Sequence, residues 1–512
     1  MCIKEDYNVG IDLGTTYSCL AYIDDKGDPI IEKNFEQEET TPSVILFNED
    51  REIIVGSPAK DMAAMYPSER TFVSVKRYIG TDYEVDVDGE TYTPVTLSAS
   101  ILRKILGDFN EAHDYEVKRA VITCPAYFGQ NERDSTRNAG IIAGLEDVII
   151  INEPTAAAIS FGYGTDGSKK RVLVYDLGGG TFDVTILDID GSTFNAVATD
   201  GVRLLGGRDW DVALSSLILE KVSQLSGVLV EDLENNENAV LTLDIDTESI
   251  KKRLTTAEST RGSMTVNGER ILYKVTRDEF EAVTVSLFDR TMAVIDDVLR
   301  SKDFTIEDID DIILVGGSCK MPHIKEGIKK EYPNTSVQLF DPDRSVARGA
   351  ALFARSESLK ETEASEHSVD VKNVLSKTFG VKVDYNGKDL ISNLIYRNEP
   401  LPMENVKVYY PLEDGQESVQ IQIFENSTLR SDNEPRTEVD DGTYVGAFVM
   451  ELPEGVVMNT PVTVRFMAAE DGTISAEAEC MDEIKEYDLE SLLSLSEADL
   501  EKSRGLIEKV RN

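Results

Sequence analysis

One local pattern occurs twice in this chain, at Gly10–Ser18 (GIDLGTTYS) and at Tyr175–Val184 (YDLGGGTFDV). In each copy an apolar strand that carries an aspartate runs into a glycine-rich turn with hydroxyl side chains. Successive amide N–H groups of such a turn can point at phosphate oxygens, because glycine lets the backbone approach closely. Asp12 and Asp176 could hold a hydrated Mg²⁺ between them. One copy alone could be a hairpin turn, but two matched copies predict a cleft that grips a nucleotide from both sides.

The size and charge of the chain narrow the classes of function. With 512 residues it is too long for one hydrophobic core and fits two or three domains. Its formal net charge of −43 would repel nucleic acid and anionic membranes, so neither is an expected partner. The chain shows no membrane-crossing run and no secretory signal, and its five cysteines are scattered. These features predict a cytoplasmic protein whose cysteines are thiols.

The character of the sequence changes along the chain. Strand-like and helix-like segments alternate through about residue 355, which predicts an α/β fold. The polar, acidic stretch 356–370 predicts a linker. Short alternating strands follow and predict an all-β domain. The last twenty residues or so predict one amphipathic helix with a Ser-x-x-Asp capping signal.

Two further segments could complete a nucleotide site. Ile313–Pro322 (ILVGGSCKMP) runs from a strand into glycines and then a helix that starts near Pro322, an arrangement that suits an anion or ribose but is also common as a simple turn. The small-residue segment Asp341–Ala354 could pack closely against that turn. In the helix predicted over Glu248–Thr260, spacing puts four polar residues on one face, which could line a pocket or be a solvated, salt-bridged surface; they are Glu248, Lys251, Lys252 and Thr255.

Taken together, the motifs resemble the seventy-kilodalton heat-shock chaperones of the DnaK type, with a reduced lid. GIDLGTTYS, FVSVKRYIG, AVITCPAYF, VYDLGGGTFDV, ILVGGSCKMP and VARGAA occur in that family's order. The resemblance implies a multidomain protein with an α/β actin-like ATPase domain (a duplicated ribonuclease H-like fold) over residues 1–365. It further implies a linker over 366–374, an all-β peptide-binding sandwich over 375–482 and a short helical segment, a truncated lid, over 483–512. The implied activity is ATP hydrolysis by a molecular chaperone that captures apolar segments of unfolded proteins.

The resemblance also assigns roles to residues around ATP or ADP, Mg²⁺ and K⁺ as an optional second ion. Hydrolysis would involve Lys76, Glu153, Thr181 and Asp183, with Asp12, Asp176 and Glu153 around Mg²⁺ through water. The nucleotide would contact Gly14, Thr15, Thr16, Tyr17, Gly178, Gly179, Gly180, Thr181, Gly206, Gly207, Glu248, Lys251, Lys252, Thr255, Gly316, Gly317, Ser318, Lys320 and Asp343. The family more usually has arginine at Lys320.

Five apolar residues of the β domain are implied by the resemblance to lie in or around a groove for extended peptide, where main-chain hydrogen bonds would give affinity and side-chain pockets selectivity. Sandwich core is an equally good interpretation of each residue, and spacing does not separate the two. The five are Val381, Leu412, Val419, Ile421 and Ile423.

Departures from the family's pattern concern coupling between the domains. Lys372 and Asn373 interrupt the apolar run of the linker, which predicts weak docking of the linker on the ATPase domain. Ile149 stands where the family has an arginine used with J-domain partners, so J-domain co-chaperones and nucleotide-exchange factors stay open as partners. A nucleotide-binding holdase or exchange-factor-like relative with little turnover is the main alternative. A sugar or acetate kinase and a filament-forming actin relative share the predicted fold and are disfavoured by the added β domain.

Overall fold

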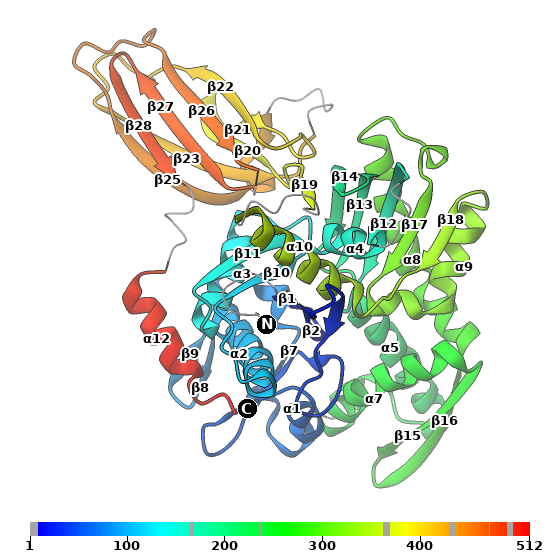
Figure 1. Cartoon of the computed structure of the whole chain (residues 1–512). Coiled ribbons are helices and arrows are strands. Elements are labelled where there is room, and N and C mark those ends of the chain that lie inside the picture. Colours follow the sequence, from blue (N-terminus) through cyan, green and yellow to red (C-terminus); the bar gives the residue numbers. More distant parts are fainter. Residues whose placement is uncertain are drawn as a thin grey trace.

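The computed structural model describes residues 9–163, 168–235, 237–361, 369–429, 436–470, 472–488 and 495–511. An α/β body of two lobes carries a β-sandwich at one end, and a helix near the C-terminus runs along the first lobe (Figure 1). Among the described residues no helix is long and apolar enough to cross a membrane. The four cysteines in this part of the chain are free and buried, as the sequence predicts.

The two lobes are built on sheets of the same topology. The first sheet has the order β11-β10-β1-β2-β3, with β4 paired to β2, and the second has the order β18-β17-β12-β13-β14-β19. In both, a central strand is parallel to one neighbour and antiparallel to the other, and these central strands, β1 and β12, carry Asp12 and Asp176. The strands are β1 (Val9–Asp12), β2 (Tyr17–Ile23), β3 (Pro29–Ile31), β4 (Thr41–Pro42), β10 (Arg119–Cys124), β11 (Asp147–Asn152), β12 (Lys170–Leu177), β13 (Phe182–Asp190), β14 (Thr193–Val202), β17 (Asp311–Val315), β18 (Ser336–Leu339) and β19 (Asp370–Lys372).

Two helices, α4 (Glu153–Gly162) and α10 (Ser345–Glu361), pack against each other and join the two sheets through one apolar cluster. Their contact is close because small residues meet there. A Cβ on Gly349 would lie 1.7 Å from the carbonyl oxygen of Ala156, so no larger residue fits at this crossing. The small-residue segment that the sequence places near the third glycine turn therefore holds the two lobes together.

Each lobe has an outer part. The first lobe adds a three-stranded sheet of order β6-β5-β7 and helices α1, α2 and α3, and the second adds helices α5 to α9 and the hairpin β15–β16. The helix expected over 248–260 ends at Thr256, since Ser259 and Thr260 already pair with Thr276 and Val275 in the hairpin. The elements are β5 (Val44–Phe47), β6 (Ile53–Val55), α1 (Ser57–Met62), β7 (Thr71–Val73), β8 (Val85–Val87), β9 (Glu90–Tyr92), α2 (Pro94–His113), α3 (Gln130–Ala143), α5 (Gly207–Ser226), α6 (Val230–Glu234), α7 (Glu237–Thr256), β15 (Ser259–Val266), β16 (Glu269–Thr276), α8 (Arg277–Arg300) and α9 (Pro322–Glu331).

The C-terminal β domain is a sandwich of a five-stranded sheet, β24-β21-β20-β23-β25, and a four-stranded sheet, β22-β26-β27-β28. Residues 483–488, expected in the helical segment, instead form β28, because a turn at Met481 folds this alternating stretch back onto β27. The strands are β20 (Thr378–Tyr385), β21 (Lys388–Ile395), β22 (Met403–Tyr409), β23 (Ser418–Asn426), β24 (Arg436–Glu438), β25 (Thr443–Glu451), β26 (Val462–Ala468), β27 (Ile474–Cys480) and β28 (Glu483–Asp488).

The linker is docked, contrary to the expectation drawn from Lys372 and Asn373. Residues 370–372 form β19, which extends the sheet of the second lobe by pairing in parallel with Thr193–Asn195 of β14. Strand pairing uses backbone groups, and the Lys372 side chain is exposed, so no charge is buried by docking. Val369 and Val371 face the other way and pack on the cluster between the lobes. Residues 366–368 of the expected linker lie outside the described residues.

Polar contacts also join the sandwich to both lobes. The Arg397 guanidinium lies 2.9 Å from the Asp200 carboxylate, and the N–H of Thr199 donates to Asn398 Oδ1 at 2.9 Å. On the first lobe, the N–H of Gln130 at the start of α3 donates to Glu425 Oε2 at 3.4 Å. Burial, reinforced by the charge of Glu132, raises the pKa of Glu425 to about 7 although Lys377 opposes the shift.

Candidate functional site

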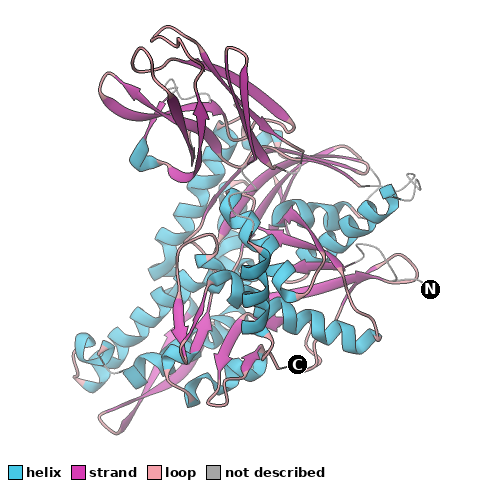
Figure 2. Cartoon of the chain, turned by 90° about the vertical axis from the view of Figure 1, so that its left-hand side faces the viewer, coloured by secondary structure: helices cyan, strands magenta, loops and turns pink. Residues whose placement is uncertain are grey.

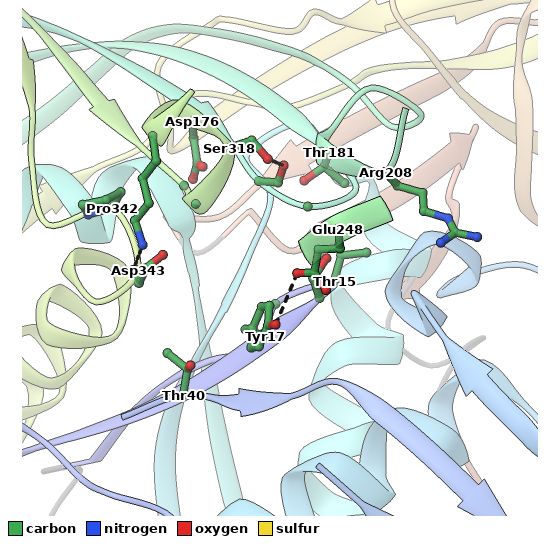
Figure 3. A pocket seen from close by; sticks show the side chains of 18 of the residues that line it. Thr15, Tyr17, Thr40, Asp176, Thr181, Arg208, Glu248, Ser318, Pro342 and Asp343 are labelled. Carbon is green, nitrogen blue, oxygen red and sulfur yellow. Dashed lines mark hydrogen bonds and ion pairs between the residues drawn. The ribbon is translucent and has the colours of Figure 1, made fainter. Parts of the chain in front are cut away.

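A cavity of about 570 Å³ opens between the two lobes, and most of the predicted nucleotide residues line it. Figure 3 shows side chains from both lobes and from the third glycine turn around this space. The predicted residues that line it are Asp12, Gly14, Thr15, Thr16, Tyr17, Lys76, Glu153, Asp176, Gly178, Gly179, Thr181, Gly207, Glu248, Lys251, Lys252, Thr255, Gly316, Gly317, Ser318, Lys320 and Asp343.

Three predicted residues, Gly180, Gly206 and Asp183, are not among those that line the cavity. Gly206 supports the turn from behind, since a Cβ there would lie 2.6 Å from the backbone of Gly180. The lining also includes eight residues that the sequence did not assign individually, some inside the segments singled out from the sequence and some outside them. These are Cys19, Thr40, Arg208, Asp211, Thr256, Met321, Pro342 and Val346.

The glycine turns are held by hydrogen bonds that fix their backbones. The N–H of Gly178 donates to the carbonyl oxygen of Thr181 at 3.1 Å, and the carbonyl oxygen of Gly178 accepts from the N–H of Gly207 at 2.9 Å and from Ser318 Oγ at 2.8 Å. In the first turn the N–H of Gly14 donates to Ser18 Oγ at 3.1 Å. The third glycine element thus contacts the second through a direct hydrogen bond, which the sequence did not show.

Three carboxylates, those of Asp12, Glu153 and Asp176, line the cavity together with Lys76, and the carboxylate of Asp183 lies just behind them. Burial and the Glu153 charge raise the pKa of Asp12 to about 7, and the same two causes raise the pKa values of Asp176 and Asp183 well above their ordinary value. Lys76 is 5% exposed and pairs with Glu153 Oε1. The excess of negative charge in a buried place suits a cation.

Asp12, Glu153 and Asp176 line the same cavity, where their carboxylates could surround a hydrated ion. Among the described residues no group of three His, Cys, Asp or Glu side chains is placed to hold a metal directly. Mg²⁺ retains most of its water ligands in proteins and needs only a few carboxylates around that shell. Asp12, Asp176 and Glu153 are therefore suited to hold Mg²⁺ through water.

Asp183 lies just behind the cavity, next to the motif that contains Pro125. Its Oδ1 accepts a hydrogen bond from the N–H of Ala126 at 3.0 Å, while its Oδ2 is buried without a hydrogen-bond partner in the protein. Arg133 donates to Asn152 Oδ1 at 2.6 Å and to the carbonyl oxygen of Ala126 at 3.5 Å. Arg133 thus connects the residue before Glu153 with the residue after Pro125.

A polar contact joins the two lobes beside the cavity, at Tyr17 and Glu248. Lys60 Nζ of α1 lies 2.6 Å from Glu248 Oε2 of α7 and donates to the Tyr17 hydroxyl at 3.0 Å. Lys252 joins the same group, 2.8 Å from Glu248 Oε1. Although burial acts against it, hydrogen bonds from Lys252 and Lys60 lower the pKa of Glu248 to about 2. Lys60 could not be found from the sequence, because the motif pattern gives no sign that α1 reaches across the cleft.

Two other lysines of the second lobe, Lys251 and Lys320, differ in their contacts. Lys251 is buried and donates to the carbonyl oxygen of Gly207 at 2.9 Å, besides pairing with Asp211 at 2.8 Å. It therefore positions the start of α5 as well as lining the cavity. Lys320 pairs with Asp343 at the side of the cavity that holds the third glycine turn.

Burial separates the five predicted peptide-groove residues. Ile423 is fully buried, and Val381 and Ile421 are nearly so, all within the sandwich core. Val419 packs against that core from its edge, and Leu412 is 69% exposed. These exposures favour the core interpretation for Ile423. The groove role of the five residues stays a prediction.

The fold and the cleft define a class: a duplicated α/β protein whose lobes enclose a cavity lined by glycine turns, joined by a docked linker to a β-sandwich. Comparison with known proteins agrees, since the family model described as Hsp70 protein matches residues 8–87 and 83–509. The chain is 37% identical over 514 residues to the chaperone protein DnaK of Thermosipho melanesiensis, covering 98% of this chain and 83% of that protein. It is 36% identical over 504 residues to the DnaK of Thermotoga petrophila, covering 96% and 81%. The chain belongs to the Hsp70 family, and its fold is the Hsp70 fold.

Proposed function

We propose that this Hsp70-family chaperone binds Mg-ATP in the cleft, hydrolyses it to ADP and phosphate, and captures extended apolar segments of unfolded proteins with its β-sandwich. The observation that carries the nucleotide part is the convergence of two glycine turns, a buried lysine and surplus buried carboxylates on one cavity. Members of the family are ATP-dependent chaperones, and the residues that the motifs assign to the nucleotide lie around that cavity.

In this proposal the protein's own groups do most of the work. The backbones of Gly14–Thr16 and Gly178–Gly180 bind the phosphates, and bound Mg²⁺ supplies charge neutralisation at the phosphate oxygens. Lys76, held by Glu153, stabilises negative charge that develops on the terminal phosphate. Thr181 and Asp183 orient the attacking water, for which the unpartnered Asp183 Oδ2 has free acceptor capacity.

The sandwich would bind peptide at its exposed apolar rim rather than through its core residues. Leu412 and Tyr410 are largely exposed on the segment after β22, and Val449 and Tyr444 are exposed on β25. Main-chain hydrogen bonds to an extended segment would add affinity. J-domain co-chaperones and nucleotide-exchange factors are proposed as partners by family membership, and a cytoplasmic location agrees with the composition.

The decisive experiment measures steady-state ATP turnover of the full chain with and without an unfolded apolar peptide, alongside equilibrium binding of a fluorescent ATP analogue. We expect Mg²⁺-dependent turnover that responds to peptide. Nucleotide binding without turnover would favour the holdase alternative. Turnover that depends on an added sugar, with no response to peptide, would favour a kinase.

A further inference from the structure

Ser74 stands between strand β7 and the 3₁₀ helix η3 (Val75–Tyr78) in a backbone conformation that serine rarely adopts. Its φ is 56° and its ψ is 30°, which is the left-handed region. Side chains are disfavoured there because the Cβ comes too close to the following carbonyl oxygen. The Ser74 hydroxyl does not cap the helix that follows, so no capping bond explains the conformation. Such a residue persists only where surrounding contacts hold it, and functional sites are where such residues cluster.

The turn at Ser74 changes which side of the chain is buried. Strand β7 lies in the first lobe, below the sandwich that Figure 1 and Figure 2 both show at the upper end of the molecule. If this strand continued, Val75 would share a face with Val73, because side chains two residues apart point the same way. Val73 is 46% exposed, whereas Val75 is 5% exposed and belongs to the core of the first lobe. The left-handed residue thus interrupts the alternation, and the consecutive side chains of Val75 and Lys76 are both buried.

The two residues in the middle of η3 reach different parts of the site. Lys76 pairs with Glu153, and both line the cavity. Arg77 Nε donates to the carbonyl oxygen of Gly180 at 3.0 Å, and the Arg77 guanidinium lies 2.8 Å from the Asp209 carboxylate. A Cβ on Gly180 would lie 2.9 Å from Arg77 Nε, so the second glycine turn has little room to shift against this side chain. One short helix therefore sets the position of Lys76 relative to the second glycine turn.

The far end of η3 is fixed by hydrogen bonds. The N–H of Arg77 donates to the carbonyl oxygen of Ser74 at 3.0 Å, and the N–H of Ile79 donates to that of Lys76 at 3.3 Å. Arg203, directly after β14 of the second lobe, donates to the carbonyl oxygen of Arg77 at 3.0 Å and to that of Ile79 at 2.7 Å. The helix is thus held at its C-terminal end by the second lobe. Its direction at the other end depends on the backbone of Ser74.

We propose that Ser74 is a positioning residue for hydrolysis: its left-handed backbone aims Lys76 at Glu153 and holds it in register with the second glycine turn. The role belongs to the backbone conformation and not to the hydroxyl. This inference rests on the proposed function, since it concerns the lysine that would act on the terminal phosphate. Glycine, which adopts the left-handed conformation freely, should serve at this position, and a β-branched residue, which is crowded there, should not.

The first test compares Ser74→Val with Ser74→Gly in the full chain. In Ser74→Val we expect single-turnover ATP hydrolysis to slow about tenfold while the affinity for a fluorescent ATP analogue stays close to that of the unmodified chain. Ser74→Gly should keep the rate. Asp114→Val is the matched control, because Asp114 is also left-handed, with φ 47° at the end of α2, and does not line the cavity. A full rate in Ser74→Val, or an equal loss in Ser74→Gly or in Asp114→Val, would overturn the proposal.

The second test follows the position of Lys76 without using turnover. An amine-acylating reagent is applied to the nucleotide-free chain, and the labelling of each lysine is measured by mass spectrometry. Lys104 is the internal reference, because it is 3% exposed and paired with Asp108, much as Lys76 is 5% exposed and paired with Glu153. Labelling of Lys76 relative to Lys104 should rise about tenfold in Ser74→Val and stay unchanged in Ser74→Gly and Asp114→Val.

This measurement separates the failure of the inference from the failure of the proposed function. Unchanged labelling of Lys76 in Ser74→Val would overturn the role of Ser74, whatever the turnover. If the unmodified chain hydrolyses no ATP, the catalytic part of the proposed function fails. The labelling result then still decides whether the left-handed backbone of Ser74 positions Lys76.

Discussion

Lys76 is the residue whose removal tests the proposed chemistry most sharply. Its ammonium is buried between Glu153 and Asp12, where it faces the cavity floor and not solvent. The glycine turns and the metal supply most contacts to bound ATP, so Lys76→Ala should leave nucleotide affinity within a few-fold of the original. A preorganised charge of this kind contributes about 2.7–4 kcal/mol to the transition state. We therefore expect the hydrolysis rate to fall by about 100- to 1,000-fold.

The same substitution also costs stability, and a control must separate the two effects. Removing one partner of a buried ion pair costs about 3–5 kcal/mol, a large part of the total stability of a domain. Lys104 offers a matched control, because it is equally buried and lies 2.6 Å from Asp108, away from the cleft. Lys104→Ala should destabilise the first lobe and leave hydrolysis intact.

Single-turnover hydrolysis at saturating Mg-ATP, with thermal unfolding followed in parallel, is the measurement for both variants. An unchanged single-turnover rate in Lys76→Ala would refute the assigned role. An equal loss of rate in Lys104→Ala would show that the effect comes from stability and not from the charge. Nucleotide binding close to that of the unmodified chain, together with a strongly reduced hydrolysis rate, is the expected pattern for Lys76→Ala.

Three further predictions concern the metal, the interface and the linker. Asp12→Asn and Asp176→Asn should each raise the Mg²⁺ concentration needed for half-maximal ATP turnover. An unchanged Mg²⁺ dependence in both variants would show that these carboxylates do not hold the metal. Docking raises the pKa of Glu425 to about 7, so docking of the sandwich should be strongest at acidic pH and weaken as pH rises through about 7. Hydrogen exchange of the β19 amides measures this dependence, and Glu425→Gln should abolish it. Val371→Asp should undock the linker, whereas Lys372→Leu should change the protection of the β19 amides from hydrogen exchange little, since the Lys372 side chain is already exposed. A large increase of that protection in Lys372→Leu would contradict the observed strand register.

The nucleotide cleft could be predicted from the sequence because its chemistry depends on short contiguous motifs. In each of the two matched motifs, a strand with an aspartate is followed directly by a glycine turn with hydroxyl side chains. The local sequence therefore sets both the conformation of the motif and its expected role. Lys60 and Arg208 lack such a signature: the fold brings Arg208 to the cavity lining, and it brings Lys60 to Glu248 and Tyr17, which line the cavity. Asp183, which was expected to help place the attacking water, does not line the cavity, whereas its motif neighbour Thr181 does.

The errors in the sequence interpretation have one physical source, which is strand pairing. Lys372 in the linker was judged by the charge of its side chain, and residues 483–488 were assigned to the helical segment through the family resemblance and not from their alternating pattern. A strand at a sheet edge needs only one apolar face, and its backbone provides the attachment. In both segments the alternation of polar and apolar residues was therefore a sign that the segment pairs with the edge of a sheet.

The two attachments of the sandwich differ in what can break them. Strand β19 pairs with an edge of the second-lobe sheet at three positions, and two half-buried valines support it. Opening so short a strand breaks few contacts, so its local free energy of opening should be low. The C-terminal segment, helix α12 (Glu497–Ile507) and the residues after it, pairs Val510 with Ile53 and has side chains inside the first-lobe core, so its opening would expose part of that core. Undocking of the sandwich should therefore begin at β19.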